Sequence, residues 1–449
     1  MRPLLQRFGL RTPEVRAWAM YDWANSGMLT LVATAVFPVF FASAYVSGGD
    51  QAEATSRFTL ATTIGLAIIA VASPFLGTLA DYSAAKVRLL GGFMLLGVAA
   101  TTALFFIGQG QWVFALVAFS LANIGLNGSF TFYDSLLPHV AAPEERDRVS
   151  SAGFALGYLG GGLLLAFGLA LIQFPGWFGL PSGDGLTPGQ ATLPVRLSFV
   201  IAALWWFVFA LPVLRRVPEP AAAPRPAGRS LVRETAGQLA RTFHELRRYR
   251  DASIFLLAFL IYNDGIGTII RLAAIYGKEI GITESTLIGS ILLTQFVGVP
   301  FAILFGRLAG RIGAKQAIYI ALAVYAGISV LGYFVRTDLH FVALACLVGT
   351  VQGGAQALSR SLFSSMIPKS KSGEFFGFYA VFEKGAAILG PLVFWVALAT
   401  TGSSRNAILS IILFFVTGAL LLTRVDIARG QATARDAEAE LSRLAAPPA

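Results

Sequence analysis

Twelve long apolar runs restrict what this chain can fold into more than any other feature of its sequence. Each run is long enough to cross a lipid bilayer, which takes roughly 20 apolar residues in a helix. Hydrophobic residues account for 56% and charged residues for 13% of the 449 positions, so most of the chain is expected to lie in lipid. The runs predict an all-α polytopic membrane protein whose transmembrane helices begin near Ala17, Phe58, Val87, Gln111, Ser151, Val195, Ala252, Ser285, Lys315, Phe341, Phe375 and Asn406.

The positive charges indicate how the spans are oriented. An even number of spans puts both termini on one side, and most lysines and arginines of the loops fall on that side. The opposite side holds only Arg57, Arg196, Lys278, Arg336 and Arg405. The positive-inside rule therefore predicts cytosolic termini, and we expect a bacterial cytoplasmic (inner) membrane protein. The net charge of +10 is thus explained by orientation among membrane lipids, and no nucleic-acid partner is expected.

A short charged loop occurs twice and indicates an internal duplication. The first copy, Gly77 to Asp81, reads Gly-Thr-Leu-Ala-Asp, and the second copy, Gly306 to Gly310, reads Gly-Arg-Leu-Ala-Gly. A proline and a glycine further along also repeat at nearly the same offset of about 230 residues. The predicted order is a cytosolic tail (1–16), an N-terminal six-helix bundle (17–217), a cytosolic linker with a basic amphipathic helix (218–251), a C-terminal six-helix bundle (252–424) and a cytosolic tail (425–449).

The repeated loops are predicted to act in gating. A small residue lets two helices meet tightly at a turn, and basic residues hold that turn at the cytosolic surface. Asp81 is the only acid of the repeated loop, so we expect it to fasten the cytosolic side in an outward-facing state. The candidate gating residues are Gly77, Asp81, Lys86, Arg88, Gly306, Arg307 and Arg311.

The first loop resembles a motif of the major facilitator superfamily, whose loop between helices 2 and 3 reads G-x-L-A-D-R-x-G-R-K-x-x-L. The match holds at Gly77, Leu79, Ala80, Asp81, Lys86 and Leu89, while Ala84 and Ala85 replace the glycine and the arginine. Two further strings, YDWANS from Tyr21 and QGGAQALSRS from Gln352, resemble one branch of it, the unknown-major-facilitator or vacuole-effluxer family, which is related to autophagy. The resemblance implies a fold of two six-helix halves and, from the eukaryotic members, the release of amino acids.

Polar residues inside the spans supply the candidate site. Ionisable residues occur inside spans 1, 4, 7, 10 and 11 and are absent from the interiors of spans 3, 6, 9 and 12. In the superfamily, helices 1, 4, 7 and 10 line the central cavity. The candidate proton-coupling residues are Asp22, Asp134, Asp264 and Glu383, because intramembrane carboxylates are costly and usually functional. The candidate substrate-binding residues are Asn25, Asn123, Asn127, Asn263, Arg271, Gln352, Gln356, Arg360 and Lys384.

Other roles stay open for several of these residues. Asp22 could be hydrated near the cytosolic surface, and the asparagines of span 4 could only bond neighbouring helices. The basic residues inside the spans could bind a substrate carboxylate or neutralise the acids. Asp264 and Arg271 are seven residues apart on one helix, so a common cavity is expected but a direct pair is not. The glycines of span 5, Gly153, Gly157, Gly160, Gly161 and Gly162, indicate close helix packing.

The sequence lacks the motifs of ATP-driven transporters and of metal- or cofactor-dependent membrane proteins. It has no phosphate-binding G-x-x-x-x-G-K-[ST] loop, its single cysteine is Cys346, and its histidines are far apart, so no cofactor and no metal site are expected. We therefore predict a monomeric secondary transporter, not an enzyme, that moves a small polar or zwitterionic solute, amino-acid-like by preference, across the membrane by alternating access. Protons are the expected coupling ion, and the direction of transport, export included, stays open. The alternatives are a multidrug or organic-anion efflux transporter and a non-transporting receptor or scaffold.

Overall fold

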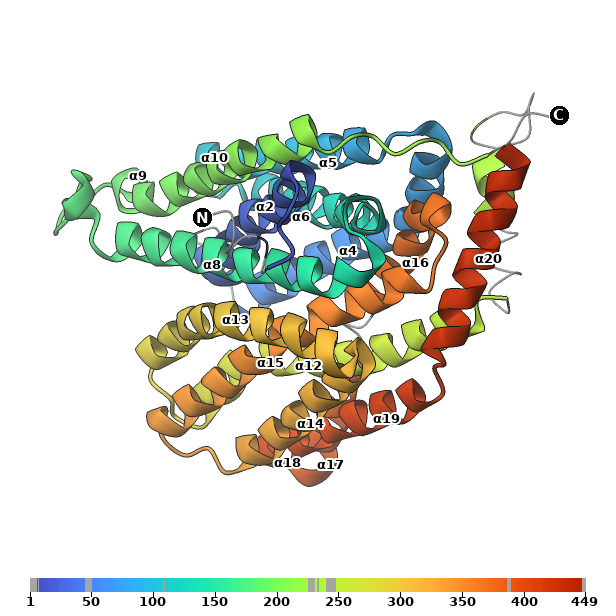
Figure 1. The fold of residues 1–449 in the computed structure, drawn as a ribbon. Helices are drawn as coiled ribbons and strands as arrows, with labels where there is room; N and C mark the ends of the chain where they lie inside the picture. The colour runs from blue at the N-terminus through green and yellow to red at the C-terminus, as the bar shows by residue number, and fades with distance from the viewer. Residues whose placement is uncertain are drawn as a thin grey trace.

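The computed structural model describes residues 6, 8–44, 51–108, 110–224, 231, 234–239, 248–385 and 389–445, and everything below concerns these residues. They form helices and no strand. Twelve segments are long and apolar enough to cross a membrane, as the sequence predicts. Figure 1 shows them gathered into two groups, the first six spans (blue to green) beside the last six (yellow to red).

The first six spans share one apolar core that includes the buried rings of Trp18 and Trp206. Span 1 is continuous through three helices, α2 (Pro13–Gly27), the π-helix η1 (Met28–Val36) and α3 (Phe37–Ala44). The others are α4 (Gln51–Ser83), α5 (Lys86–Ala103) with η2 (Leu104–Phe106), α6 (Trp112–Ser135) with α7 (Leu137–Val140), α8 (Arg146–Gln173) after η3 (Pro143–Glu145), and α10 (Leu193–Arg216). The short helices η4 (Pro175–Phe178) and α9 (Pro188–Ala191) lie in the loop between α8 and α10.

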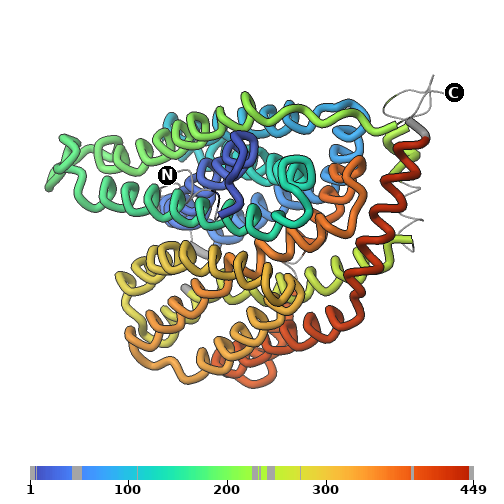
Figure 2. The backbone as a smooth tube through the Cα atoms, viewed as in Figure 1, coloured from blue at the N-terminus to red at the C-terminus, as the bar shows by residue number. Residues whose placement is uncertain are grey.

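The last six spans build a second core around rings such as Phe259 and Tyr325. Their helices are α12 (Arg250–Glu279), α13 (Glu284–Ile312), α14 (Ala314–Tyr333), α15 (Asp338–Ser365), α16 (Ser372–Gly385) after η5 (Lys369–Lys371), α17 (Leu389–Thr401), α18 (Ser404–Ser410) and α19 (Ile412–Thr423). The amphipathic helix α20 (Ile427–Ala445) follows and lies along one end of the bundle (Figure 1). We call this end the linker side, because the linker between the halves lies there too (Figure 2). The positive-inside rule predicts that it is cytosolic.

Most spans begin within a few residues of their predicted starts, and the fifth differs most. It begins at Pro143 rather than near Ser151. Its first turns carry Arg146 and Asp147, which raise the local polarity above that of an apolar run. Both side chains bond α15, Arg146 to the carbonyl oxygen of Ser364 and Asp147 to the hydroxyl of Ser361, so the charged turn stays helical. The predicted amphipathic helix of the linker falls largely on residues 225–230, 232, 233 and 240–247, outside the described residues.

Candidate functional site

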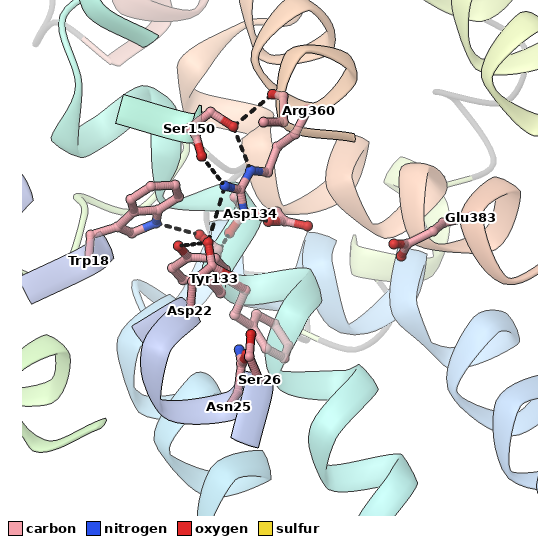
Figure 3. A network of polar contacts seen from close by, with 12 residues as sticks. Trp18, Asp22, Asn25, Ser26, Tyr133, Asp134, Ser150, Arg360 and Glu383 are labelled. Carbon is pink, nitrogen blue, oxygen red and sulfur yellow. Dashed lines mark hydrogen bonds and ion pairs between the residues drawn. The ribbon is translucent and has the colours of Figure 1, made fainter. Parts of the chain in front are cut away.

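Arg360 reaches from α15 in the C-terminal half into the N-terminal half and binds two carboxylates there (Figure 3). Its Nη1 lies 2.9 Å from Oδ1 of Asp134 on α6, and its Nη2 lies 3.3 Å from Oδ2 of Asp22 on α2. Its Nε donates to the hydroxyl of Ser150 at 2.9 Å, and its Nη2 also donates to the Ser150 carbonyl oxygen at 3.1 Å. The side chain of Arg360 is 3% exposed. We call Asp22, Asp134, Ser150 and Arg360 the Arg360 cluster.

Aromatic rings enclose the guanidinium of Arg360. Its Cζ lies 4.8 Å from the ring centroid of Trp18, 5.2 Å from that of Tyr133 and 4.6 Å from that of Phe154, distances at which a cation is attracted to a ring face. The hydroxyl of Tyr133 donates to Asp22 at 2.8 Å, and the indole of Trp18 donates to the Tyr133 carbonyl oxygen at 2.9 Å. The cluster is therefore held by an aromatic cage as well as by charge.

Glycines of α8 make room for the polar face of α2, which confirms the packing predicted for span 5. A Cβ atom at Gly153 would come within 2.6 Å of Asp22 Oδ2, and one at Gly157 within 2.7 Å of Ser26 Oγ. One turn further, a Cβ atom at Gly161 would lie 2.7 Å from the Thr30 hydroxyl. The polar residues of α2 and η1 thus follow one line against α8, starting from the Arg360 cluster.

Asp264 forms a second buried cluster, which stays within the C-terminal half. It accepts the backbone N–H of Gly390 at the start of α17 at 2.7 Å, and its other oxygen lies 3.4 Å from Nη2 of Arg271. The expectation that these two residues do not pair directly is therefore wrong. Arginine side chains on a helix point toward its N-terminus, so the long guanidinium of Arg271 reaches back over two turns to Asp264. Asp264 is fully buried, whereas the Arg271 side chain is 42% exposed.

The other ionisable candidates lie near the Arg360 cluster without joining it. Glu383 accepts from Lys384 at 2.7 Å, and Figure 3 draws Glu383 apart from the cluster. The ammonium of Lys384 lies 5.9 Å from the ring centroid of Phe130. Glu383 and Lys384 neutralise each other, so neither is a countercharge of Arg360 in this structure.

The asparagine candidates are mostly engaged within their own helices. The amide of Asn123 donates to the Phe119 carbonyl oxygen and that of Asn127 to the Asn123 carbonyl oxygen, each one turn earlier on α6. Asn25 is completely buried, and its Nδ2 has no hydrogen-bond partner among the described residues. Asn263 is half-buried on α12. The structure does not bring these four residues together, and their predicted role in substrate binding stays a prediction.

Gln352 and Gln356 line a cavity of about 400 Å³. They lie two turns and one turn before Arg360 on the same helix. Leu29, Thr30 and Thr34 line it from the N-terminal half, and α12, α13 and α15 supply most of the rest. The cavity lies on the far side of the Arg360 cluster from the linker, since α15 runs from the cavity toward the linker side.

On the linker side, Asp81 binds the N-terminus of α16 across the two halves. Its carboxylate accepts the backbone N–H groups of Gly373 at 3.0 Å and of Glu374 at 2.8 Å, where the helix dipole favours a negative charge. Lys86 lies 2.8 Å from Asp81 and is equally buried. These contacts agree with the latch expected for Asp81, whose part in gating stays a prediction.

Two members of this latch could not be singled out in the sequence. Lys86 donates to the hydroxyl of Ser372 at 2.9 Å and lies 3.1 Å from Nε2 of His139, which in turn lies 3.0 Å from the Ser372 hydroxyl. Isolated polar residues at loop ends carry no periodic signal. Arg88, by contrast, has an exposed side chain, and its backbone N–H donates to Glu219 of the linker. The structure therefore does not place the Arg88 side chain in the latch.

The second copy of the repeated loop closes the same side by packing. A Cβ atom at Gly306 would lie 2.7 Å from the side chain of Ser151, so α13 and α8 cross closely there. Arg307 stacks over the Phe8 ring, with 5.4 Å between Cζ and the centroid, and the Arg311 side chain is exposed. The halves thus meet on the linker side along α4 and α16 and along α8 and α13.

Comparison with known proteins identifies the family. Residues 11–435 match the family described as vacuole effluxer Atg22 like. The chain belongs to this vacuole-effluxer family. Its relatives include the uncharacterized MFS-type transporter YxiO of Bacillus subtilis, 38% identical over 94% of this chain and 96% of that protein. Autophagy-related protein 22 of Yarrowia lipolytica is 27% identical over 63% of this chain, and the match spans about half of that longer protein, 51%.

The solved structures agree on the fold of this vacuole-effluxer family member. FucP, the fucose:proton symporter of E. coli and a major facilitator superfamily transporter solved in the outward conformation, has a TM-score of 0.67 at 15% identity, covering 92% of this chain and 98% of FucP. The fold is that of the major facilitator superfamily. Together with the family, this fold makes the protein a secondary transporter. The resemblance seen in the Gly77 loop and in the YDWANS string is confirmed.

Proposed function

We propose that the protein moves a small polar solute by alternating access and that the Arg360 cluster couples this movement to protons. An amino-acid-like solute is our preference, because the chain shares its family with the fungal autophagy-related proteins. Coupling to protons has a parallel in FucP, which by its name is a proton symporter of the same fold. In an alternating-access cycle, the contacts on the linker side must open after solute enters from the opposite side.

The charge balance of the Arg360 cluster is the observation that carries the proposal. Asp22 and Asp134 both face Arg360, so with both acids ionised a buried site has one negative charge in excess. An uncompensated charge in a low-dielectric interior is costly, and binding one proton removes the excess. Because Arg360 belongs to the opposite half, a change in this charge balance alters how firmly the halves are held together.

Asp134 is the acid better placed to exchange the proton. Both Tyr133 and Arg360 bind the same oxygen of Asp22, Oδ2, and Asp22 is 6% exposed as a side chain. Asp134 uses only Oδ1 toward Arg360 and is 11% exposed. A proton on Asp134 would weaken the ion pair and release α15 from α6.

The experiment compares gradient-driven transport with exchange in one variant. A thermal-shift screen of the purified protein against amino acids, dipeptides, sugars and organic anions first identifies a stabilising solute. In vesicles, Asp134→Asn is then expected to abolish accumulation of that solute under a pH gradient and to retain its exchange, because asparagine keeps the shape without the titration. Asp184→Asn, the same change in an exposed loop, is the matched control. Accumulation by Asp134→Asn at the level of the control would contradict the coupling role.

A further inference from the structure

The cavity beside the Arg360 cluster has an unusual lining for a transporter whose spans hold so many charges. Its lining combines aliphatic residues with hydroxyl and amide side chains and the rings of Tyr276 and Phe341, and both α13 and α15 contribute aliphatic and polar residues. Among the described residues that line it, none is Asp, Glu, Lys, Arg or His. The charged residues of the spans all lie outside this wall.

Four polar side chains of the cavity wall lack hydrogen-bond partners among the described residues, whereas hydroxyls such as those of Thr294 and Ser329 bond backbone carbonyl oxygens. The side-chain amides of Gln295, Gln352 and Gln356 have no hydrogen-bond partner within the described part of the chain, and all three residues are half-buried. The hydroxyl of Ser290 is buried and also lacks a partner among the described residues. Primary amides offer two donors and an acceptor each, so the wall presents neutral hydrogen-bonding groups of both kinds to whatever occupies the cavity.

We infer that this cavity binds the transported solute and that the solute is net-neutral, with an aliphatic body against the aliphatic residues of the wall and its polar groups against the three glutamines. The inference rests on the proposed function and narrows its substrate class. A net anion or cation would find no countercharge in the wall and would lose its hydration there. The volume of about 400 Å³ is within the usual range for small-molecule sites.

The position of the cavity separates the solute from the proton. Gln352, Gln356 and Arg360 follow one another at one-turn intervals on α15, so the solute lies next to the Arg360 cluster and outside it. Both Nη atoms and Nε of Arg360 already donate to Asp134, Asp22 and Ser150, so the guanidinium has no free donor pair for a substrate carboxylate. The coupled proton is then the only net charge that moves with the solute.

Four probes with one aliphatic body test the inference by equilibrium binding to the purified protein. Norvaline is zwitterionic, N-acetylnorvalinamide is uncharged, N-acetylnorvaline is an anion and norvalinamide is a cation. We expect the two net-neutral probes to raise the melting temperature and to bind at least tenfold more tightly than the two charged probes. Equal or tighter binding of either charged probe overturns the inference, as does a panel in which none of the four binds.

A charge placed in the wall gives the second arm. Gln356→Glu keeps the shape of the side chain and is expected to invert the preference, favouring the cationic probe at least tenfold over the uncharged one. Gln173→Glu, the same change at an exposed position of α8, is the matched control. An unchanged preference in Gln356→Glu overturns the inference. Because binding is measured without a pH gradient, its result does not depend on the coupling role tested by Asp134→Asn.

Discussion

Gly77 and Gly306 occupy equivalent places in the two halves, yet the contacts around them differ in kind. Four residues after Gly77, the carboxylate of Asp81 binds the N-terminus of α16 and the buried ammonium of Lys86. Four residues after Gly306 there is Gly310, and α13 meets α8 through small side chains. One sequence pattern thus closes the linker side by electrostatics at one crossing and by packing at the other. The comparison predicts that only the α4–α16 crossing responds to charge.

The largest displacement of helices is expected from adding a methyl group at Gly77. A Cβ atom there would lie 2.0 Å from the carbonyl oxygen of Gly373, a backbone atom that cannot rotate away. Gly77→Ala should therefore separate α4 from α16 on the linker side, and overpacking of this kind costs about 1–3 kcal/mol or more. Spin labels at the exposed positions of Arg88 and Lys369, with Cys346 replaced by serine, measure the separation.

The matched variant of this test is Gly306→Ala at the other crossing. Its Cβ atom would meet the Ser151 side chain at 2.7 Å, a milder overlap, so labels at the exposed Glu144 and Arg311 should move less. Equal displacements at the two crossings would contradict the expectation that α4 and α16 pack more closely at Gly77 than α13 and α8 do at Gly306.

The second effect concerns charge at Asp81. Asp81→Asn removes the charge that Lys86 pairs with and leaves a buried ammonium, a penalty of about 3–5 kcal/mol for a broken buried pair. We expect the labels at positions 88 and 369 to report an opened linker side, with the α8–α13 distance changing less. The reciprocal change, Gly310→Asp, puts a carboxylate near Arg148 and should alter stability by less than about 1 kcal/mol. A closed α4–α16 crossing in Asp81→Asn would show that packing suffices there too.

The third effect contrasts the acids inside the spans. Asp264 binds Gly390 and Arg271 within its own half, whereas Asp22 and Asp134 bind across the halves. Asp264→Asn should lower the melting temperature, because it leaves Arg271 unpaired. The decrease should be smaller than for breaking a fully buried ion pair, since the Arg271 side chain is 42% exposed. Accumulation under a pH gradient should stay intact. Loss of gradient-driven accumulation with retained exchange would instead establish Asp264 as the coupling residue that its place in the sequence suggests.

The smallest effect is a pH dependence of the α4–α16 crossing. The Lys86 ammonium can only donate, so Nε2 of His139 accepts from it and the imidazole is neutral in the closed latch. A protonated imidazole would put a second cation beside Lys86 and close to Lys369, so proton uptake by His139 on the linker side opposes the closed latch. Closure should therefore weaken as the pH falls, and His139→Gln should flatten that dependence. An unchanged pH profile in His139→Gln contradicts this role.

The sequence predicted features that rest on a repeated physical signal. It did not predict contacts that one polar side chain makes with one distant partner. Twelve apolar runs and two glycine loops predicted the fold, because bilayer thickness and helix crossing impose length and spacing. The acids and the arginine of the Arg360 cluster were recognised as costly intramembrane charges. Their pairing was not, because Arg360 is 226 residues from Asp134 and 338 from Asp22 along the chain.

Single polar contacts account for what was missed or wrong. Ser150, Ser372 and His139 are ordinary surface residue types, and only the meeting of the two halves gives them buried partners. The Asp264–Arg271 pair was excluded because sequence spacing measures the distance between helix positions and ignores the reach of a side chain. Only part of the cavity could be predicted from the sequence. The polar face of α15 was evident, but the aliphatic residues that α12 and α13 contribute have the composition of any membrane helix.

The aromatic cage around Arg360 gives the protein an optical signal of its own. Trp18 is completely buried, its indole N–H is bonded to the Tyr133 carbonyl oxygen, and its ring stacks on Tyr133 with centroids 4.4 Å apart. A positive charge from the opposite half lies 4.8 Å from the same ring. Withdrawal of that charge changes the electric field on the indole and so shifts its emission. In a variant whose other six tryptophans are replaced by phenylalanine, Trp18 should therefore report the separation of the halves by fluorescence, without any attached label.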